Sequence, residues 1–307
     1  MSELPLDAYY DLTQVGAVAV SPDGERTAFT TTEYDPDADE SVSSLFVAPT
    51  DGSREPHRLT RVSGAGSPTW SPDGDRLAFL AARDEDSDLR VGREDEAEDE
   101  EDEEDENGGT TANGNGDEEP KPQVWAFNLA LGGDARQITH FEEGVKEFDW
   151  APDGERLVVT ARDPTDAESA YLDERREGGP VETERVQHKL DGVGYTDTVT
   201  SYLFVVGESA VLGDEAADAD AARKLDDAYG RGAFEGLSGL QPDWGESGEI
   251  AFVSYRGDDP DSTLATDVFT VSPDGGDAAA ITDGDLNCNG PTWSPSGDRI
   301  AVAAGDA

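Results

Sequence analysis

One pattern of apolar and polar positions occurs five times along the 307-residue chain. Each copy is a short apolar strand, a turn containing Pro, Asp or Gly, and a second apolar strand. Such turns reverse the chain because Pro fixes φ, Asp bonds nearby backbone and Gly accepts positive φ. The pattern predicts five β-hairpins: AVAVSPDGERTAFT from Ala17, PTWSPDGDRLAFLA from Pro68, FDWAPDGERLVVTA from Phe148, PDWGESGEIAFVSY from Pro242 and PTWSPSGDRIAVAA from Pro291.

A second pair of strands follows each of the first four hairpins. These pairs are LFVAPTDG with PHRLT, VWAFNLALGG with ARQIT, YLFVVGES with ARKLDD, and DVFTVSPDGGD with AAAITDGD. Four strands per repeat are typical of a β-propeller blade. We therefore expect an all-β fold of four-stranded antiparallel blades. It would contain four complete repeats and the first hairpin of a fifth, and so form an incomplete ring.

The residue before each turn sets the length of the repeats. These residues are spaced by 50, 80, 94 and 49 positions, and they are Val20, Trp70, Trp150, Trp244 and Trp293. A blade usually needs about 40–50 residues, so the two long spacings predict insertions. We expect one domain over residues 1–307, a partial propeller with repeats at about 15–60, 62–140, 144–228, 238–283 and 290–307.

The two insertions differ in composition. Between Asp95 and Glu106 eleven of twelve residues are acidic, and Gly, Asn and Thr follow without apolar periodicity. We expect residues 93–120 to form a disordered acidic insertion. Residues 163–197 contain TDAESAYLDERREGG, which favours a helix, and then VETERVQHKLDGVGYTD. This second insertion is predicted to be ordered.

The charge of the chain excludes several classes of partner. The sequence has 71 acidic and 22 basic residues, for a net charge of -49. Nucleic acids and anionic membranes need a basic surface, so neither is expected as a partner. Acidic residues occur in nearly every loop, and their mutual repulsion weakens as salt shortens the screening length. The composition therefore indicates a salt-adapted protein from a salt-rich cytoplasm.

Other features also favour a soluble cytoplasmic protein without a cofactor. Cys288 is the sole cysteine, and MSELPLDAYY lacks the basic and apolar regions of a signal peptide. No run of about 18 apolar residues exists. The three histidines have no zinc-ligand spacing. The segment from Asp285 resembles the opening of a calcium loop, but Ser296 stands where a bidentate Glu is needed. We expect no metal.

The hairpins themselves resemble a known repeat. SPDG turns with a preceding Trp and a following R-hydrophobic-A-hydrophobic strand are similar to the TolB-type propeller repeat. The N-terminal LDAYYDLTQVGAVAVSPDGERTAFT, with RVQHKLDGVGYTD and the YLFVV that follows, resembles the N-terminal propeller of acylaminoacyl peptidases and related dipeptidyl peptidases. These are serine peptidases of the prolyl oligopeptidase family. The resemblance covers essentially the whole chain.

The resemblance implies a propeller that caps an α/β-hydrolase domain and admits only short peptides. That domain has a Ser, Asp, His triad with the nucleophile in G-x-S-x-G. This chain has no such pentapeptide, and the nearest strings are GAGSP at Gly64 and GLSGL at Gly236. We therefore expect no catalytic residue here. The predicted function is that of a non-catalytic propeller, which gates peptide access and docks a C-terminal hydrolase domain missing from this chain.

Six residues of the second insertion are candidates for an interface or for substrate gating. Polar groups and flexible glycines coincide there, and the resemblance implies that this insertion faces the hydrolase domain. The candidates are Arg185, His188, Asp191, Gly192, Gly194 and Tyr195. The alternative is an ordinary ordered insertion packed by its aromatic residue. The tryptophans that precede the turns are expected to pack between blades and not to form a ligand cage.

Two other functions stay open on sequence grounds. A stand-alone TolB-like or WD-repeat-like propeller would bind a protein partner. A metal-dependent propeller hydrolase would need ligands placed in phase with the repeats, and the three histidines are not so placed. A fifth hairpin without a following blade would also leave one face uncovered, so a homo-oligomer is a further possibility.

Overall fold

The computed structural model describes most of the predicted repeats. It covers residue 10 and residues 12–35, 40–62, 64–83, 120–183, 185–186, 188–190, 194–197, 199–230 and 235–306. Nearly all of the predicted acidic insertion at 93–120 lies outside the described residues.

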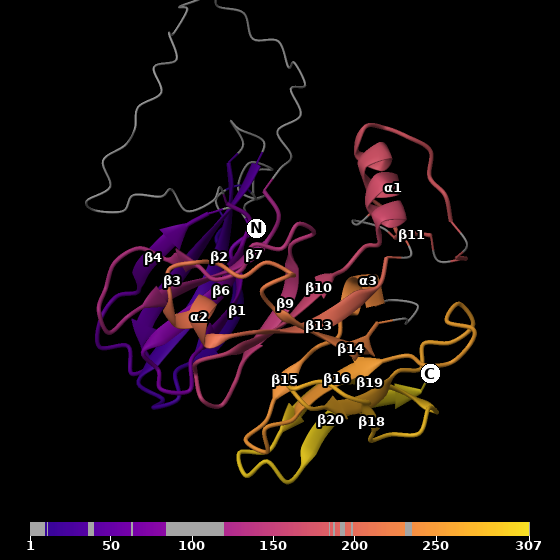
Figure 1. Ribbon diagram of the computed structural model, residues 1–307. Coiled ribbons are helices and arrows are strands. Elements are labelled where there is room, and N and C mark those ends of the chain that lie inside the picture. The colour runs from indigo at the N-terminus through magenta and orange to yellow at the C-terminus, as the bar shows by residue number, and fades with distance from the viewer. Residues whose placement is uncertain are drawn as a thin grey trace, which may run out of the picture.

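Four antiparallel four-stranded sheets follow one another along the described chain (Figure 1). The first contains β1 (Gln14–Val20), β2 (Arg26–Asp35), β3 (Glu40–Pro49) and β4 (His57–Arg61). The second contains β5 (Gly66–Trp70), β6 (Arg76–Ala81), β7 (Gln123–Asn128) and β8 (Arg136–Gln137). The third contains β9 (Val145–Trp150), β10 (Leu157–Arg162), β13 (Ser201–Val206) and β14 (Arg223–Tyr229). The fourth contains β15 (Asp243–Trp244), β16 (Ile250–Ser254), β17 (Asp267–Val271) and β18 (Ala279–Ala280).

Two hairpins and three helices complete the described elements. β19 (Leu286–Trp293) pairs with β20 (Ile300–Asp306), and β11 (Lys189–Leu190) pairs with β12 (Gly194–Tyr195). The helices are α1 (Asp166–Arg176), α2 (Glu208–Leu212) and α3 (Glu235–Ser238). The predicted all-β, propeller-like fold of four-stranded antiparallel sheets is confirmed.

The hydrophobic core lies between neighbouring sheets. The second strands of the second, third and fourth sheets are buried along nearly their whole length. These strands are β6, β10 and β16. One core cluster joins the first and second sheets, a second joins the second and third, and a third joins the third and fourth. Strands buried on both faces are expected where sheets are stacked face to face.

The SPDG turn is closed by its own side chains, as the sequence predicts. In the first repeat Ser21 Oγ donates to Asp23 Oδ1 at 2.6 Å, and the backbone N–H of Glu25 donates to the same oxygen at 3.0 Å. These bonds stabilise the charged form and hold the pKa of Asp23 below its ordinary value. Gly24 takes a φ of 75°, which favours glycine.

An arginine after each of the first three turns connects one sheet to the next. The Arg26 guanidinium donates to Gly74 O at 2.7 Å and lies 4.7 Å from the centre of the Trp70 ring. Arg76 repeats this arrangement, with a 2.7 Å bond to Gly154 O and the Trp150 ring at 5.9 Å. We call this contact the arginine clamp. It combines a charge-assisted hydrogen bond with a cation–π contact.

The tryptophans pack between sheets, as the sequence predicts. Trp70 and Trp150 are 7% and 4% exposed. The indole N–H of Trp70 donates to Ala19 O, and that of Trp150 donates to Thr69 O, each at 3.1 Å. Both acceptors belong to the preceding sheet. Each tryptophan therefore fixes the spacing of two neighbouring innermost strands.

Candidate functional site

The second insertion and a small pocket lie at the same end of the sheets. The first strand of each sheet is its innermost strand. Because neighbouring strands are antiparallel, the second strand finishes, and the third begins, on the side of the sheet where the first strand starts. The connections 163–200 and 255–266 and the starts of β15 and β19 therefore share one end, which we call the insertion face. Figure 1 shows α1 projecting from this end of the third sheet.

Helix α1 begins and ends on local signals and is tied to the sheets below it. Thr165 and Glu168 form a capping box, in which Thr165 N donates to Glu168 Oε2 at 2.8 Å. At the other end Arg176 binds the Glu143 carboxylate. Burial alone would raise the pKa of Glu143, but Arg176 and Lys121 bind the charged form and hold the pKa below its ordinary value. The insertion is thus anchored by ion pairs.

Arg185 connects the insertion to the fourth sheet. Its Nε donates to Asp261 Oδ1 at 2.9 Å, and the backbone N–H of Val186 donates to Asp261 Oδ2 at 3.1 Å. Both oxygens of one carboxylate therefore hold the insertion against the 255–266 connection. Sequence analysis made Arg185 a candidate for an interface or for substrate gating, and the structure gives it this contact within the chain.

Three other candidates lie together in the short hairpin β11–β12. The rings of His188 and Tyr195 stack with their centres 6.5 Å apart, and Gly194 precedes the tyrosine with a φ of 94°. Lys189 Nζ lies 4.8 Å from the centre of the Tyr195 ring. Tyr195 is 49% exposed, so this aromatic pair faces solvent. The remaining candidates, Asp191 and Gly192, lie outside the described residues.

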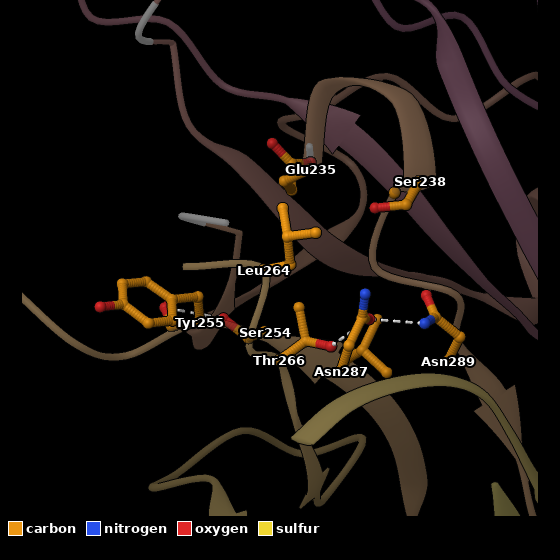
Figure 2. A pocket seen from close by; sticks show the side chains of 10 residues that line it. Glu235, Ser238, Ser254, Tyr255, Leu264, Thr266, Asn287 and Asn289 are labelled. Atoms are coloured by element: carbon orange, nitrogen blue, oxygen red, sulfur yellow. Dashed lines mark hydrogen bonds between the residues drawn. The ribbon is translucent and has the colours of Figure 1, made fainter. Parts of the chain in front are cut away.

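A pocket of about 110 Å³ opens at the insertion face between the fourth sheet and hairpin β19–β20 (Figure 2). Its walls come from α3, the end of β16, the 255–266 connection and the start of β19. The lining residues are Glu235, Ser238, Gly239, Val253, Ser254, Tyr255, Leu264, Thr266, Asn287 and Asn289. Apolar and uncharged polar groups predominate. The one carboxylate is that of Glu235, and its Oε1 is buried without a hydrogen-bond partner among the described residues.

Two asparagines on β19 give the pocket a directed amide group. Asn289 Nδ2 donates to Asn287 Oδ1 at 2.7 Å. The single proton of the Thr266 hydroxyl goes to Cys288 O at 2.6 Å, so Asn289 is the side chain that holds the Asn287 carbonyl oxygen. Figure 2 shows its amide nitrogen pointing into the space between Leu264 and Ser238. This nitrogen can donate to a ligand's carbonyl or carboxylate oxygen.

The wall formed by α3 is held in place by the innermost strand of the third sheet. Lys146 Nζ donates to the carbonyl oxygens of Glu235 and Gly236 at 2.7 and 2.6 Å. Glu147 Oε2 accepts the backbone N–H groups of Leu240 and Gln241 at 2.8 and 3.1 Å. Burial lowers the pKa of Lys146 and raises the pKa of Glu147. Partly buried charges therefore fix this wall.

The pocket offers hydrogen bonds and apolar contact, and it positions no nucleophile. Ser254 Oγ donates to Tyr229 O at 2.6 Å, and none of the ten lining residues is a histidine. Among the described residues, no group of three or more His, Cys, Asp or Glu side chains is placed to hold a metal. The arrangement therefore suits binding. Within the same described ranges, no helix is both long and apolar enough to span a bilayer.

Sequence analysis pointed to the insertion but missed the pocket. Asn287 and Asn289 entered only as an incomplete calcium loop, and Ser238 only as part of GLSGL. One signal could have found the asparagines. They are two positions apart just before the fifth hairpin predicted from Pro291, so an extended backbone there would place both side chains on one face.

Comparisons with solved structures show a likeness of fold. The acylaminoacyl peptidase of Pyrococcus horikoshii aligns with 99% of this chain and 37% of its own, at a TM-score of 0.61 and 13% identity. An acylaminoacyl peptidase in complex with Z-Gly-Gly-Phe-chloromethyl ketone aligns with 96% of this chain and 36% of its own, at a TM-score of 0.58 and 13% identity. No family model matches the chain.

Comparisons with curated sequences also find peptidases. The uncharacterized peptidase YuxL of Bacillus subtilis is 25% identical over 68% of this chain and 28% of its own length. A probable dipeptidyl-peptidase 5 of Arthroderma benhamiae is 25% identical over 64% of this chain and 24% of its own length. The chain therefore spans about a quarter of the length of the curated relatives that it matches.

Proposed function

We propose that this chain is the propeller part of a serine oligopeptidase of the acylaminoacyl-peptidase or dipeptidyl-peptidase type. In this proposal it docks an α/β-hydrolase domain and admits short peptides to it, and it cleaves nothing itself. The observation that carries the proposal is the agreement of two comparisons. The sequence relatives are peptidases, and the fold aligns with acylaminoacyl peptidase over 99% of the chain.

The insertion face is the surface that we assign to this role. It combines the insertion, which the contact of Arg185 with Asp261 holds in place, and the pocket, in which a hydrogen bond from Asn289 orients the Asn287 amide. A peptide main chain presents carbonyl acceptors to such a donor. Val253 and Leu264 supply apolar contact in the same pocket. We propose that short peptides contact this face as they approach the hydrolase domain.

The experiment is a binding measurement on the purified chain in concentrated potassium chloride. Fluorescence anisotropy follows labelled N-acyl tripeptides and their unacylated counterparts. We expect saturable binding of short peptides, weakened about tenfold in Asn287→Ala because a directed hydrogen bond is lost. A fluorophosphonate probe should label no serine, because the sequence has no G-x-S-x-G element.

Two variants separate the insertion face from general effects of charge. Arg185→Ala removes the contact with Asp261 at this face and should weaken peptide binding. Arg223→Ala is the matched control, because Arg223 bonds Asp274 O at 3.3 Å at the opposite end of the sheets. It should leave binding unchanged. A folded chain that binds no short peptide, or that loses binding equally in both variants, would contradict the proposal.

A further inference from the structure

The direction of the Asn287 amide in the pocket depends on its neighbours, because an amide side chain can turn over. Its oxygen accepts hydrogen bonds and its nitrogen donates them, and the two ends have nearly the same shape. Turning Asn287 over would therefore exchange a donor for an acceptor in the pocket. Whatever fixes this direction decides which ligand groups the pocket can bind.

Gln241 begins a series of three hydrogen-bonded amides that ends at Asn287. The backbone N–H of Gly290 donates to Gln241 Oε1 at 2.6 Å, and Gln241 Nε2 donates to the carbonyl oxygen of Ser238 at 3.1 Å. A backbone N–H can only donate and a carbonyl oxygen can only accept. Two main-chain groups therefore fix which end of the Gln241 amide is oxygen and which is nitrogen.

The direction fixed at Gln241 passes through Asn289 to Asn287. Gln241 Nε2 also donates to Asn289 Oδ1 at 3.3 Å, so Asn289 turns its nitrogen the other way. Asn289 Nδ2 then donates to Asn287 Oδ1 at 2.7 Å. The Asn287 nitrogen is left facing the space between Leu264 and Ser238, as Figure 2 shows. We call Gln241, Asn289 and Asn287 the amide relay.

The Thr266 hydroxyl favours the opposite direction for Asn287, so the amide relay decides it. Thr266 Oγ1 gives its proton to Cys288 O at 2.6 Å and lies 3.3 Å from Asn287 Oδ1. This hydroxyl could accept from the Asn287 nitrogen if that amide turned over. In the turned direction, however, the nitrogens of Asn287 and Asn289 would face each other, two donors without an acceptor. The bond from Asn289 therefore holds the donor in the pocket.

Gln241 occupies a backbone conformation that non-glycine residues rarely adopt. Its φ is 51°, in the left-handed region. Its backbone N–H donates to Glu147 Oε2 at 3.1 Å, which ties this conformation to the third sheet. Residues held in such conformations cluster at functional sites, because the surrounding structure must offset the strain. A glycine would adopt this φ more easily, but it would have no amide to begin the relay.

We infer that Gln241 is a positioning residue that makes the pocket selective for hydrogen-bond acceptors. This inference rests on the proposed function, in which short peptides reach the pocket. Through Asn289, Gln241 presents the Asn287 N–H groups, so a ligand gains a hydrogen bond when it places a carbonyl or carboxylate oxygen there. A ligand that places an N–H or an apolar group at the same point gains none. The pocket therefore recognises an acceptor oxygen of the peptide.

Asn289→Asp is the variant that should turn Asn287 over. The new side chain has the same shape and still accepts from Gln241, but a carboxylate cannot donate to Asn287. Asn287 should then donate its own N–H groups to the new carboxylate and to Thr266 Oγ1. Its oxygen should face the pocket, which exchanges the donor there for an acceptor.

Two further variants complete the set. Asn128→Asp is the matched control, because it makes the same change of charge at the end of β7. There Asn128 Oδ1 accepts the backbone N–H groups of Ala130 and Leu131, and a carboxylate oxygen can do the same. Gln241→Gly keeps the backbone conformation and removes the first amide of the relay, so Asn287 should take up both directions. Circular dichroism verifies that all three variants are folded.

The direction of Asn287 is measured without any ligand. In NMR spectra of chain with labelled asparagine and leucine, the Asn287 side-chain N–H protons should show a nuclear Overhauser effect to the Leu264 methyl groups. This effect should disappear in Asn289→Asp, weaken in Gln241→Gly and remain in Asn128→Asp. Its persistence in Asn289→Asp, or its absence from the wild type, would overturn the inference.

The selectivity of the pocket is measured in concentrated potassium chloride with two neutral ligands of one shape. One is a labelled tripeptide that ends in a methyl ketone, and the other has a methylene group in place of the ketone oxygen. Wild type and Asn128→Asp should bind the ketone about tenfold more tightly, whereas Asn289→Asp should bind both alike. An unchanged preference in Asn289→Asp would overturn the inference. Binding of neither ligand by the wild type would contradict the proposed function instead, and the NMR result would then decide the inference by itself.

Discussion

The Asp149 carboxylate accepts the backbone N–H of Trp244 at 2.8 Å and so joins the innermost strands of the third and fourth sheets. Asp243 repeats the contact with Trp293 at 2.7 Å. We call the contact between the innermost strands of two neighbouring repeats a seam. In the seams between the first and second sheets and between the second and third, the tryptophan donates its indole N–H instead. In the later seams the indole nitrogens of Trp244 and Trp293 are buried without a hydrogen-bond partner among the described residues. The hydrogen bond that joins neighbouring innermost strands therefore changes from an indole N–H donor in the first two seams to a carboxylate acceptor in the last two.

This seam predicts a pH effect on stability. Burial, with repulsion from Asp243, raises the pKa of Asp149 to about 7, above the value of 3.8 expected when unfolded. Between these two values the folded chain binds the extra proton, so its contribution to stability falls as pH rises from about 4 to 7. Asp149→Asn keeps an oxygen acceptor for Trp244 and removes this titration. We expect its melting temperature, relative to wild type, to increase from pH 5 to pH 8.

The matched control for that titration is Asp153→Asn. Asp153 lies in the turn of the same repeat. Burial alone would raise its pKa, but hydrogen bonds from the Glu155 backbone N–H and from Arg156 together outweigh burial and hold the pKa below its ordinary value. Its contribution is complete above about pH 4 and is lost only in more acidic solution. Its melting-temperature difference from wild type should therefore be constant from pH 5 to 8. A constant difference for Asp149→Asn over that range would refute the proposed titration.

The arginine clamp predicts a difference between arginine and lysine. Arg26→Ala removes both the hydrogen bond to Gly74 and the contact with Trp70, and should cost about 1–2 kcal/mol of unfolding free energy. Arg26→Lys keeps the charge but loses the planar group, so its free energy of unfolding should lie between those of the wild type and Arg26→Ala. Urea unfolding followed by tryptophan fluorescence measures this order. Equal stability of the alanine and lysine variants would show that the planar group contributes nothing.

Gly245 predicts a steric effect in the seam between the fourth sheet and the fifth hairpin. The fourth repeat is one residue shorter in its turn and has no clamp arginine, and Trp293 packs directly on Gly245. A Cβ at Gly245 would lie 2.4 Å from the Trp293 ring. Gly245→Ala should therefore destabilise the chain by about 1–3 kcal/mol. Thermal unfolding provides the measurement.

The control for this substitution is Gly236→Ala in α3. A Cβ added at Gly236 meets nothing within 4 Å, and alanine favours a helix over glycine. This variant should be as stable as wild type or slightly more stable. If Gly245→Ala were equally well tolerated, Trp293 would have to pack elsewhere in solution.

The sequence predicted the parts of the fold that repeat. Turns such as Ser21 to Gly24 and the inward tryptophans follow from local chemistry that every copy shares, so a pattern could reveal them. The carboxylate seams and the Lys146 contacts with α3 could not be predicted in this way. They join residues about 90 positions apart, and they depend on which strands lie side by side. The pocket was missed for the same reason, since its walls come from four separate segments.

The last prediction concerns salt, because repulsion and the seam contacts respond to it differently. Among the described residues, no Asp or Glu side chain is fully buried, so salt can screen most of them, whereas contacts between sheets such as Asp149 with Trp244 are largely sheltered. Raising potassium chloride from about 0.1 to 1 M shortens the screening length from about 10 to 3 Å, so the melting temperature should rise steeply over this range and less beyond it. Sucrose at equal osmolality is the control, because it favours burial without screening charge. A melting temperature that is independent of potassium chloride, or that rises equally with sucrose, would show that carboxylate repulsion does not limit the stability of this propeller.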